Sequence, residues 1–135
     1  MATWLLKTEP NDYSFEDLCR EKKTAWDGVK NNTALIHLRN MKKGDQALIY
    51  HTGKEKRIVG RARIIKGPYP DPKLNDPKLV VVDLAAGKAL KIPVTLAQIK
   101  SDARFKEFAL VKISRLSVMP VPENLERLLL KMAGE

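Results

Sequence analysis

Residue types that build disulfides, metal sites and redox centres are scarce in this sequence of 135 residues. It contains one cysteine and two histidines. A single cysteine, Cys19, can form neither an internal disulfide nor a Cys-x-x-Cys metal motif. His37 and His51 are too few for a histidine-rich site. We therefore expect no metal ion and no cofactor.

Long apolar runs are also missing. A helix that crosses a bilayer needs roughly 20 apolar residues, and no stretch approaches that length in a chain with 30% charged residues. Residues 1–4 lack the basic and apolar regions of a secretory signal peptide. We therefore expect no membrane association and a cytoplasmic location.

Catalytic sequence motifs are absent as well. There is no Gly-x-Ser-x-Gly nucleophile motif, no glycine-rich phosphate-binding loop and no His-Glu-x-x-His zinc motif. Glu9 and His51 could form an acid–base pair, but two scattered titratable residues occur in nearly every domain. We therefore expect a protein that is not an enzyme, with a hydrolase that uses Glu9 and His51 as the weaker alternative.

Positive charge is what the sequence has in excess. Lys and Arg number 25 against 16 Asp and Glu, which gives a formal charge of +9 and a pI of about 9.7. Such an excess on a small domain favours nucleic acid as the partner, although a merely basic surface is the alternative. The length and the 44% hydrophobic content are typical of a single domain, residues 1–135, and we favour a monomer.

Hydrophobic patterning predicts about six strands, with helices between them and at the end. The expected strands cover residues 3–7, 46–52, 57–66, 79–82, 92–94 and 110–118. The expected helices begin at Ser14, Thr33, Thr95 and Pro122. Because strands and helices do not alternate regularly, we expect an α+β fold with a curved, mostly antiparallel sheet or barrel and peripheral helices.

Three local patterns refine this picture. Phe15, Leu18 and Cys19 share one face of the first helix, which predicts a packing role for the cysteine. Residues 26–32 are rich in turn formers and are expected to connect two elements. Residues 67–77 contain several prolines and are expected to form a loop.

The strand predicted at residues 57–66 carries arginine on one face. Its small and apolar positions are Ile58, Gly60, Ala62 and Ile64. Its opposite face carries Arg57, Arg61 and Arg63. This arginine stripe is either a solvated face or a surface that contacts phosphates, so the three arginines are phosphate-contact candidates.

Polar and aromatic residues collect at the expected strand ends and turns, where binding sites usually lie. The candidate ligand-binding residues are Lys7, Thr8, Glu9, Pro10, Trp26, Lys30, Asn31, Tyr50, His51, Thr52, Ser114 and Arg115. Among them, a tryptophan in a turn such as Trp26 is either a core residue or a stacking platform.

Eight short blocks of sequence follow one another in an order typical of one known family. They lie at residues 4–10, 13–18, 26–31, 38–45, 50–52, 58–60, 69–71 and 115–118. Four of them read Lys-Thr-Glu-Pro, Trp-Asp-Gly-Val, Tyr-His-Thr and Arg-Leu-Ser. Each block alone is weakly specific, but together the blocks resemble the EVE domain family over nearly the whole chain.

The resemblance implies a PUA-like pseudo-barrel of mixed strands, related to the YTH domain that reads N6-methyladenine. It also implies binding of modified bases in DNA or RNA, with 5-methylcytosine-type bases as the leading case. In the family, the four quoted blocks gather around one cleft. The resemblance therefore favours Trp26 as a wall of the pocket.

From this resemblance we expect a flipped or single-stranded base to enter the cleft. Trp26, together with Tyr50, would stack on the base. Asn31 and the hydroxyl groups of Thr8 and Thr52 would read its polar edges.

Charged residues would complete the site. Glu9 would accept a hydrogen bond from an exocyclic amine, and Lys7, Lys30 and Arg115 would hold phosphate or sugar. The alternative from another functional class is a PUA-like module that binds RNA without regard to sequence, mainly through the arginine stripe.

The sequence departs from the family pattern at several of these positions. Thr8 and Thr52 stand where the family usually has serine, and Lys30 stands where it has arginine. Lysine keeps the charge but cannot make the bidentate contacts of arginine. Residues 32–36 replace an aromatic residue followed by Gln-Ala-Arg-Asn. The particular modified base is therefore not carried over from the family.

Overall fold

A computed structural model describes all residues from 1 to 135 and contains one six-stranded sheet. The strands are β1 (Thr3–Thr8), β2 (Lys23–Trp26), β3 (Gln46–His51), β4 (Arg57–Pro70), β5 (Val80–Thr95) and β6 (Val118–Pro120). Their order across the sheet is β2-β5-β4-β3-β1-β6. The β1–β3 pair is parallel and the other pairs are antiparallel. The sheet curves without closing, and the expected α+β class with a curved mixed sheet is confirmed.

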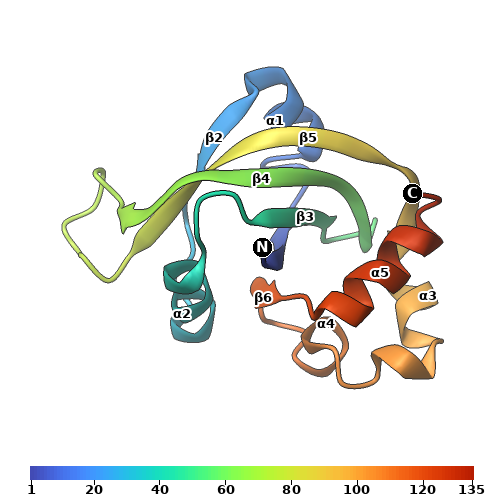
Figure 1. The fold of residues 1–135 in the computed structure, drawn as a ribbon. Coiled ribbons are helices and arrows are strands. Elements are labelled where there is room, and N and C mark those ends of the chain that lie inside the picture. Colours follow the sequence, from blue (N-terminus) through green and yellow to red (C-terminus); the bar gives the residue numbers. More distant parts are fainter.

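Helices lie around the sheet. They are α1 (Phe15–Glu21), α2 (Asn32–Asn40), α3 (Leu96–Lys100), α4 (Ala109–Lys112) and α5 (Glu123–Met132), with a 3₁₀ turn at Ala103–Phe105. Figure 1 shows α2 at one end of the sheet and α3, α4 and α5 gathered at the other end. None of the helices combines the length and the apolar character that crossing a membrane requires.

Side-chain caps explain where two of the helices begin. Ser14 accepts from the backbone N–H of Asp17, whose carboxylate accepts from the N–H of Ser14 in return. Thr95 and Gln98 form the same reciprocal capping box at the start of α3. Because each box satisfies two N–H groups that the helix leaves free, the expected starts are confirmed.

The packing role predicted for Cys19 is wrong. Phe15 and Leu18 of the two-turn helix α1 are buried, whereas the Cys19 side chain is exposed. The apolar face of this short helix is wide enough for two residues, and Cys19 lies at its edge. Partial desolvation and the neighbouring Glu16 raise the pKa of its thiol, which disfavours a reactive thiolate.

The strand expected at residues 110–118 is also wrong. Residues 109–112 form α4 and only Val118–Pro120 pair with the sheet. Leu110 and Leu116 are buried while Ile113 between them is half exposed. Short apolar runs of this kind do not distinguish helix from strand, because either element can bury them.

Two long strands replace part of the loop expected at residues 67–77. β4 continues to Pro70, and β5 includes residues 92–94, which were expected to form a separate strand. β3 pairs with β4 only as far as Arg63, so the later residues of β4 pair with β5 alone. Their other edge carries no partner strand, and proline, which lacks an N–H, is tolerated there.

A buried carboxylate anchors the N-terminal strand to the rest of the core of 33 residues. Asp45 accepts from the indole N–H of Trp4 at 3.0 Å and from the backbone N–H groups of Lys42 at 2.9 Å and Ala2 at 3.2 Å. Its position just before β3 therefore holds β1 beside that strand.

We predict that Asp45→Ala lowers the free energy of unfolding by about 2–4 kcal/mol, because the Trp4 and Lys42 N–H groups lose their acceptor. Urea unfolding measures the change. Asp76→Ala removes an exposed carboxylate that accepts one backbone N–H and is the control, with little expected loss. Equal unfolding midpoints for the two variants would contradict the anchoring role.

Candidate functional site

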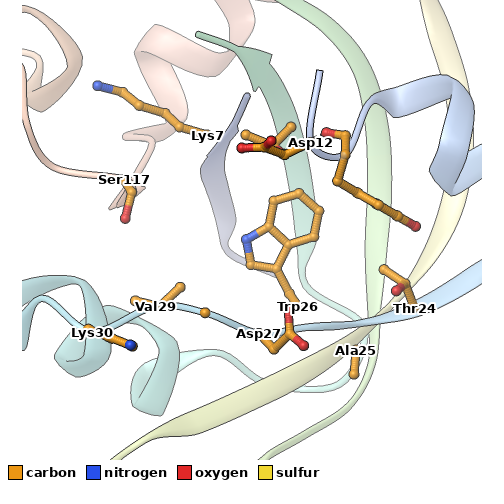
Figure 2. A pocket seen from close by; sticks show the side chains of 12 residues that line it. Lys7, Asp12, Thr24, Ala25, Trp26, Asp27, Val29, Lys30 and Ser117 are labelled. Atoms are coloured by element: carbon orange, nitrogen blue, oxygen red, sulfur yellow. Dashed lines mark hydrogen bonds between the residues drawn. The ribbon is translucent and has the colours of Figure 1, made fainter. Parts of the chain in front are cut away.

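A cleft opens between the two edges of the curved sheet. Its volume is about 450 Å³, within the range of about 300–1,000 Å³ found for small-molecule sites. The end of β1 and Ser117, which precedes β6, line one side, while β2 and the loop that follows it line the other. Figure 2 shows the Trp26 ring in the middle of this space, between Lys7 and Ser117 on one side and Thr24 on the other.

Trp26 belongs both to the core and to the cleft. It ends β2, is 7% exposed, and packs with its ring at 81° to the Tyr13 ring, with the centroids 6.1 Å apart. No hydrogen bond engages its indole N–H, and no fully buried side-chain nitrogen lacks a partner. The N–H of Trp26 is therefore open to the cleft, unlike that of Trp4, which is bonded to Asp45.

Polar groups surround the indole ring. The carboxylate of Asp12 lines the cleft, is exposed, and has no ion-pair or hydrogen-bond partner in the protein. Asp27 lies 3.7 Å from the ammonium of Lys73. The Thr8 hydroxyl donates to the carbonyl oxygen of Tyr13 at 2.6 Å. The cleft therefore offers one unengaged carboxylate and one unengaged indole N–H.

Lys7 lies between the cleft and a second cavity of about 260 Å³, and its side chain lines both. Its ammonium donates to the carbonyl oxygen of Ser114 at 2.9 Å and lies 5.6 Å from the centroid of the Tyr50 ring. Desolvation lowers the pKa of this half-buried lysine. Both partners are neutral, so no carboxylate compensates the charge.

The structure brings together four of the predicted binding residues in the cleft, namely Lys7, Thr8, Trp26 and Lys30. It places Tyr50, Thr52 and Ser114 in the second cavity. Pro10 and His51 line a third cavity. Glu9, Asn31 and Arg115 line none of these three cavities. Tyr50 therefore lies beyond Lys7, and the aromatic neighbour of Trp26 is Tyr13.

Asn31 and Glu9 have structural partners. The Asn31 side chain accepts from the N–H of Ala34 and caps α2. The Glu9 carboxylate accepts from the N–H of Asn11 at 3.1 Å and from the Thr52 hydroxyl at 3.3 Å. These contacts direct Asn31 to the backbone of α2, and Glu9 to Asn11 and Thr52, instead of to the cleft.

His51 is buried with both ring nitrogens engaged. Nε2 accepts from the backbone N–H of Phe15 at 3.0 Å, and Nδ1 lies 2.9 Å from Oε1 of Glu55. The hydrogen bond from His51 lowers the pKa of Glu55. His51 thus ties the start of α1 to β3, and its partner is Glu55 instead of the expected Glu9.

The alternation predicted for β4 is confirmed, but the arginine stripe does not adjoin the cleft. Arg57 pairs with Glu55 at 3.2 Å and Arg61 with Glu135 at 3.7 Å. Arg63 is exposed and, with Arg61, lines a shallow cavity that shares no residue with the cleft.

Sequence reasoning missed Asp12, Tyr13, Thr24 and Asp27 as cleft residues. Tyr13 lay within a family block and Asp27 beside Trp26, so both had a signal. Thr24 had none, because the short strand β2 was not recognised. Asp12 had none either, because a carboxylate in a turn is usually solvated.

A family model described as the EVE domain matches residues 2–132. Human thymocyte nuclear protein 1 is 32% identical over an alignment 155 positions long, gaps included, which covers 90% of this chain and 69% of the human protein. The mouse protein is 33% identical with the same coverage.

Solved structures resemble the fold over nearly its full length. A Rhodopseudomonas palustris protein is 44% identical with a TM-score of 0.94, covering 99% of this chain and 94% of that one. Human THYN1, solved in complex with 5-methylcytosine-containing DNA, is 30% identical with a TM-score of 0.90, covering 100% of this chain and 99% of that one. An ASCH protein of Zymomonas mobilis, 11% identical with a TM-score of 0.64, covers 97% of this chain and 95% of that one and shares the fold alone.

We predict that His51→Ala lowers the free energy of unfolding by about 1–3 kcal/mol, because the buried N–H of Phe15 loses its acceptor. Thermal or urea unfolding measures the loss. Glu55→Gln is the control, since its amide oxygen can still accept from Nδ1 and little loss is expected. A His51→Ala variant as stable as the parent would show that this bond does not hold α1.

Proposed function

The chain belongs to the EVE domain family, and we propose that it binds nucleic acid and holds one modified base, of the 5-methylcytosine type, in the cleft beside Trp26. The observation that carries the proposal is the open indole N–H of Trp26 between the two sheet edges. A human member of the family has been solved with 5-methylcytosine-containing DNA and shares the fold over its length, which supports the choice of ligand.

The base is proposed to enter the cleft as a flipped or single-stranded nucleotide. Leaving the stack costs a few kcal/mol, so an unpaired base binds more easily than a paired one. Trp26 supplies aromatic surface and one N–H donor, and Lys7 and Lys30 supply positive charge at the rim. Contact with an aromatic ring contributes about 1–3 kcal/mol per base.

Asp12 is proposed to take the role that the sequence suggested for Glu9. A carboxylate accepts from the exocyclic amine of cytosine, and the Asp12 carboxylate lines the cleft without a partner in the protein. Figure 2 shows Asp12 across the Trp26 ring from Asp27. A base that carries an amino group at this edge would therefore be favoured over thymine or uracil, which present a carbonyl oxygen there.

Binding is favoured over catalysis by the state of His51. A general base needs a free nitrogen within reach of the proton that it removes, and both nitrogens of His51 are engaged. In the hydrolase alternative, His51 would therefore have to give up one of these partners before it could act as the base. A panel of oligonucleotides separates the remaining readings: 5-methylcytosine, 5-hydroxymethylcytosine, N6-methyladenine and unmodified DNA and RNA. Equal affinity across the panel would instead support binding without regard to sequence.

We predict that Trp26→Ala weakens binding of a 5-methylcytosine oligonucleotide by about 1–3 kcal/mol, roughly tenfold or more in affinity. Trp26→Phe should lose less, because it keeps an aromatic surface, although a smaller one than indole and without the N–H. Fluorescence anisotropy with labelled single-stranded DNA measures both affinities.

Folding must be measured on the same variants, because Trp26 is also a core residue. Trp26→Ala is expected to cost about 3–5 kcal/mol of stability, so its affinity is compared at a temperature where it is folded. A folded Trp26→Ala protein that binds as tightly as the parent would remove the ring from the binding site.

We predict that Asp12→Asn reduces the preference for cytosine-type bases over thymine by about tenfold, since a charged acceptor contributes about 1.5–3 kcal/mol to a hydrogen bond. Its exposed side chain makes no contact that stabilises the fold, so the unfolding midpoint should stay unchanged. Competition between oligonucleotides that differ at one base measures the preference. An unchanged preference in the variant would exclude Asp12 as the reader of the amine.

A further inference from the structure

The second cavity, next to the cleft, is lined by three lysines from separate parts of the chain. Lys7 comes from β1, Lys56 from the turn before β4, and Lys100 from the end of α3. No carboxylate lines this cavity, and none of the three lysines forms an ion pair. Glu9 approaches Thr52 and Gly53 but is not among the lining residues. Three lysines from separate parts of the chain therefore line one cavity that no carboxylate lines.

The fold holds this arrangement in place. The carbonyl oxygen of Lys56 accepts from the N–H of Leu96 at 2.8 Å, which joins the turn before β4 to α3. The carbonyl oxygen of Ser114 positions the Lys7 ammonium. Ser114 also lines the cavity, and its hydroxyl has no hydrogen-bond partner in the protein. The lining of the cavity thus includes three lysines and one serine that has an unengaged hydroxyl.

The half-buried Lys7 loses hydration at this position. The lowered pKa of Lys7 reflects this desolvation. An anion in the cavity would offset this loss of hydration, because it would supply the opposite charge and hydrogen-bond acceptors for ammonium groups. Since the Lys7 side chain also lines the cleft, such an anion would lie one side chain away from the bound base.

We propose that the second cavity binds the phosphodiester group next to the base held in the cleft, with Lys7, Lys56 and Lys100 as its cationic ligands. The proposal rests on the proposed function, because it takes the occupant of the cleft to be a base in a polynucleotide strand. It places the path of the strand over β1, the turn before β4 and α3.

The arginine stripe fits this role less well. Glu55 and Glu135 already pair with Arg57 and Arg61, and a phosphate would have to displace them. The stripe also shares no residue with the cleft. No single side chain could therefore line both a phosphate site at the stripe and the cleft that holds the base beside Trp26.

The test removes lysine charges from the protein and phosphate charges from the nucleic acid, separately and together, and compares the effects on binding. The probe is a short single-stranded DNA with one 5-methylcytosine, in which the two linkages flanking that base are phosphates or neutral methylphosphonates. For the parent protein, neutralising the flanking linkages should weaken binding about tenfold, as loss of a hydrogen bond to a charged group does. In Lys56→Gln/Lys100→Gln, replacing the flanking phosphates by methylphosphonates should weaken binding less than about twofold. The lysine charges are already absent from this variant, so their interaction with the phosphate charges cannot be lost a second time.

Arg63→Gln/Lys88→Gln is the matched control. It removes two exposed positive charges at the shallow cavity beside the arginine stripe, so general attraction to DNA falls similarly. This variant should keep the full tenfold response to the methylphosphonates. If Lys56→Gln/Lys100→Gln responds as strongly as the control, or if the parent does not respond at all, the phosphate assignment is wrong.

The nucleoside 5-methyl-2′-deoxycytidine separates failure of this inference from failure of the proposed function. It has no phosphate, so NMR titration should show equal binding to the parent and to Lys56→Gln/Lys100→Gln, and weaker binding to Trp26→Phe. One outcome would overturn the assignment of the second cavity alone. In it, nucleoside binding depends on Trp26, but the parent and the lysine variant respond equally to the methylphosphonates. Nucleoside binding that the lysine variant abolishes would overturn the separation of base and phosphate sites.

Discussion

The incomplete closure of the sheet is the constraint from which the site follows. β2 and β6 are the two edges of the six-stranded sheet, and strong curvature brings the β2 edge opposite the β1–β6 edge without hydrogen bonds between them. Backbone groups at open edges usually invite another strand. Here side chains from both edges fill the gap instead, and they leave a cleft whose wall is Trp26.

Polar residues of the fold divide into two groups according to whether their hydrogen bonds are satisfied. Asp45, His51 and Asn31 are engaged by backbone N–H groups or by buried donors, and they hold β1, α1 and α2 in place. Asp12 and the Trp26 indole have no such partners. Because an engaged group must give up a bond before it can bind a ligand, the unengaged group defines the binding surface.

Positive charge follows the same division. Two of the three arginines of β4 form ion pairs with carboxylates, while no carboxylate lines the second cavity. The formal charge of +9 attracts anions to the protein as a whole. The placement of the carboxylates decides which lysines and arginines are left without an ion-pair partner. Lys7 connects the two hollows and is the residue through which base and phosphate recognition would be coupled.

The sequence by itself determined the family, the α+β class, most strand and helix starts, and the buried alternation of β4, because these depend on local patterns and on blocks that follow one another along the chain. It also placed Lys7, Thr8, Trp26 and Lys30 at one site through the family blocks. Only the tertiary structure decided that Glu9 and Asn31 turn away, that Tyr13 instead of Tyr50 accompanies Trp26, and that Asp12 is free. The neighbours of Trp26 depend on strand pairing between distant segments, which residue spacing does not record. The positions of Glu9, Asn31 and Asp12 depend on which hydrogen bonds the folded chain satisfies, since a residue type alone does not show whether its side chain is engaged.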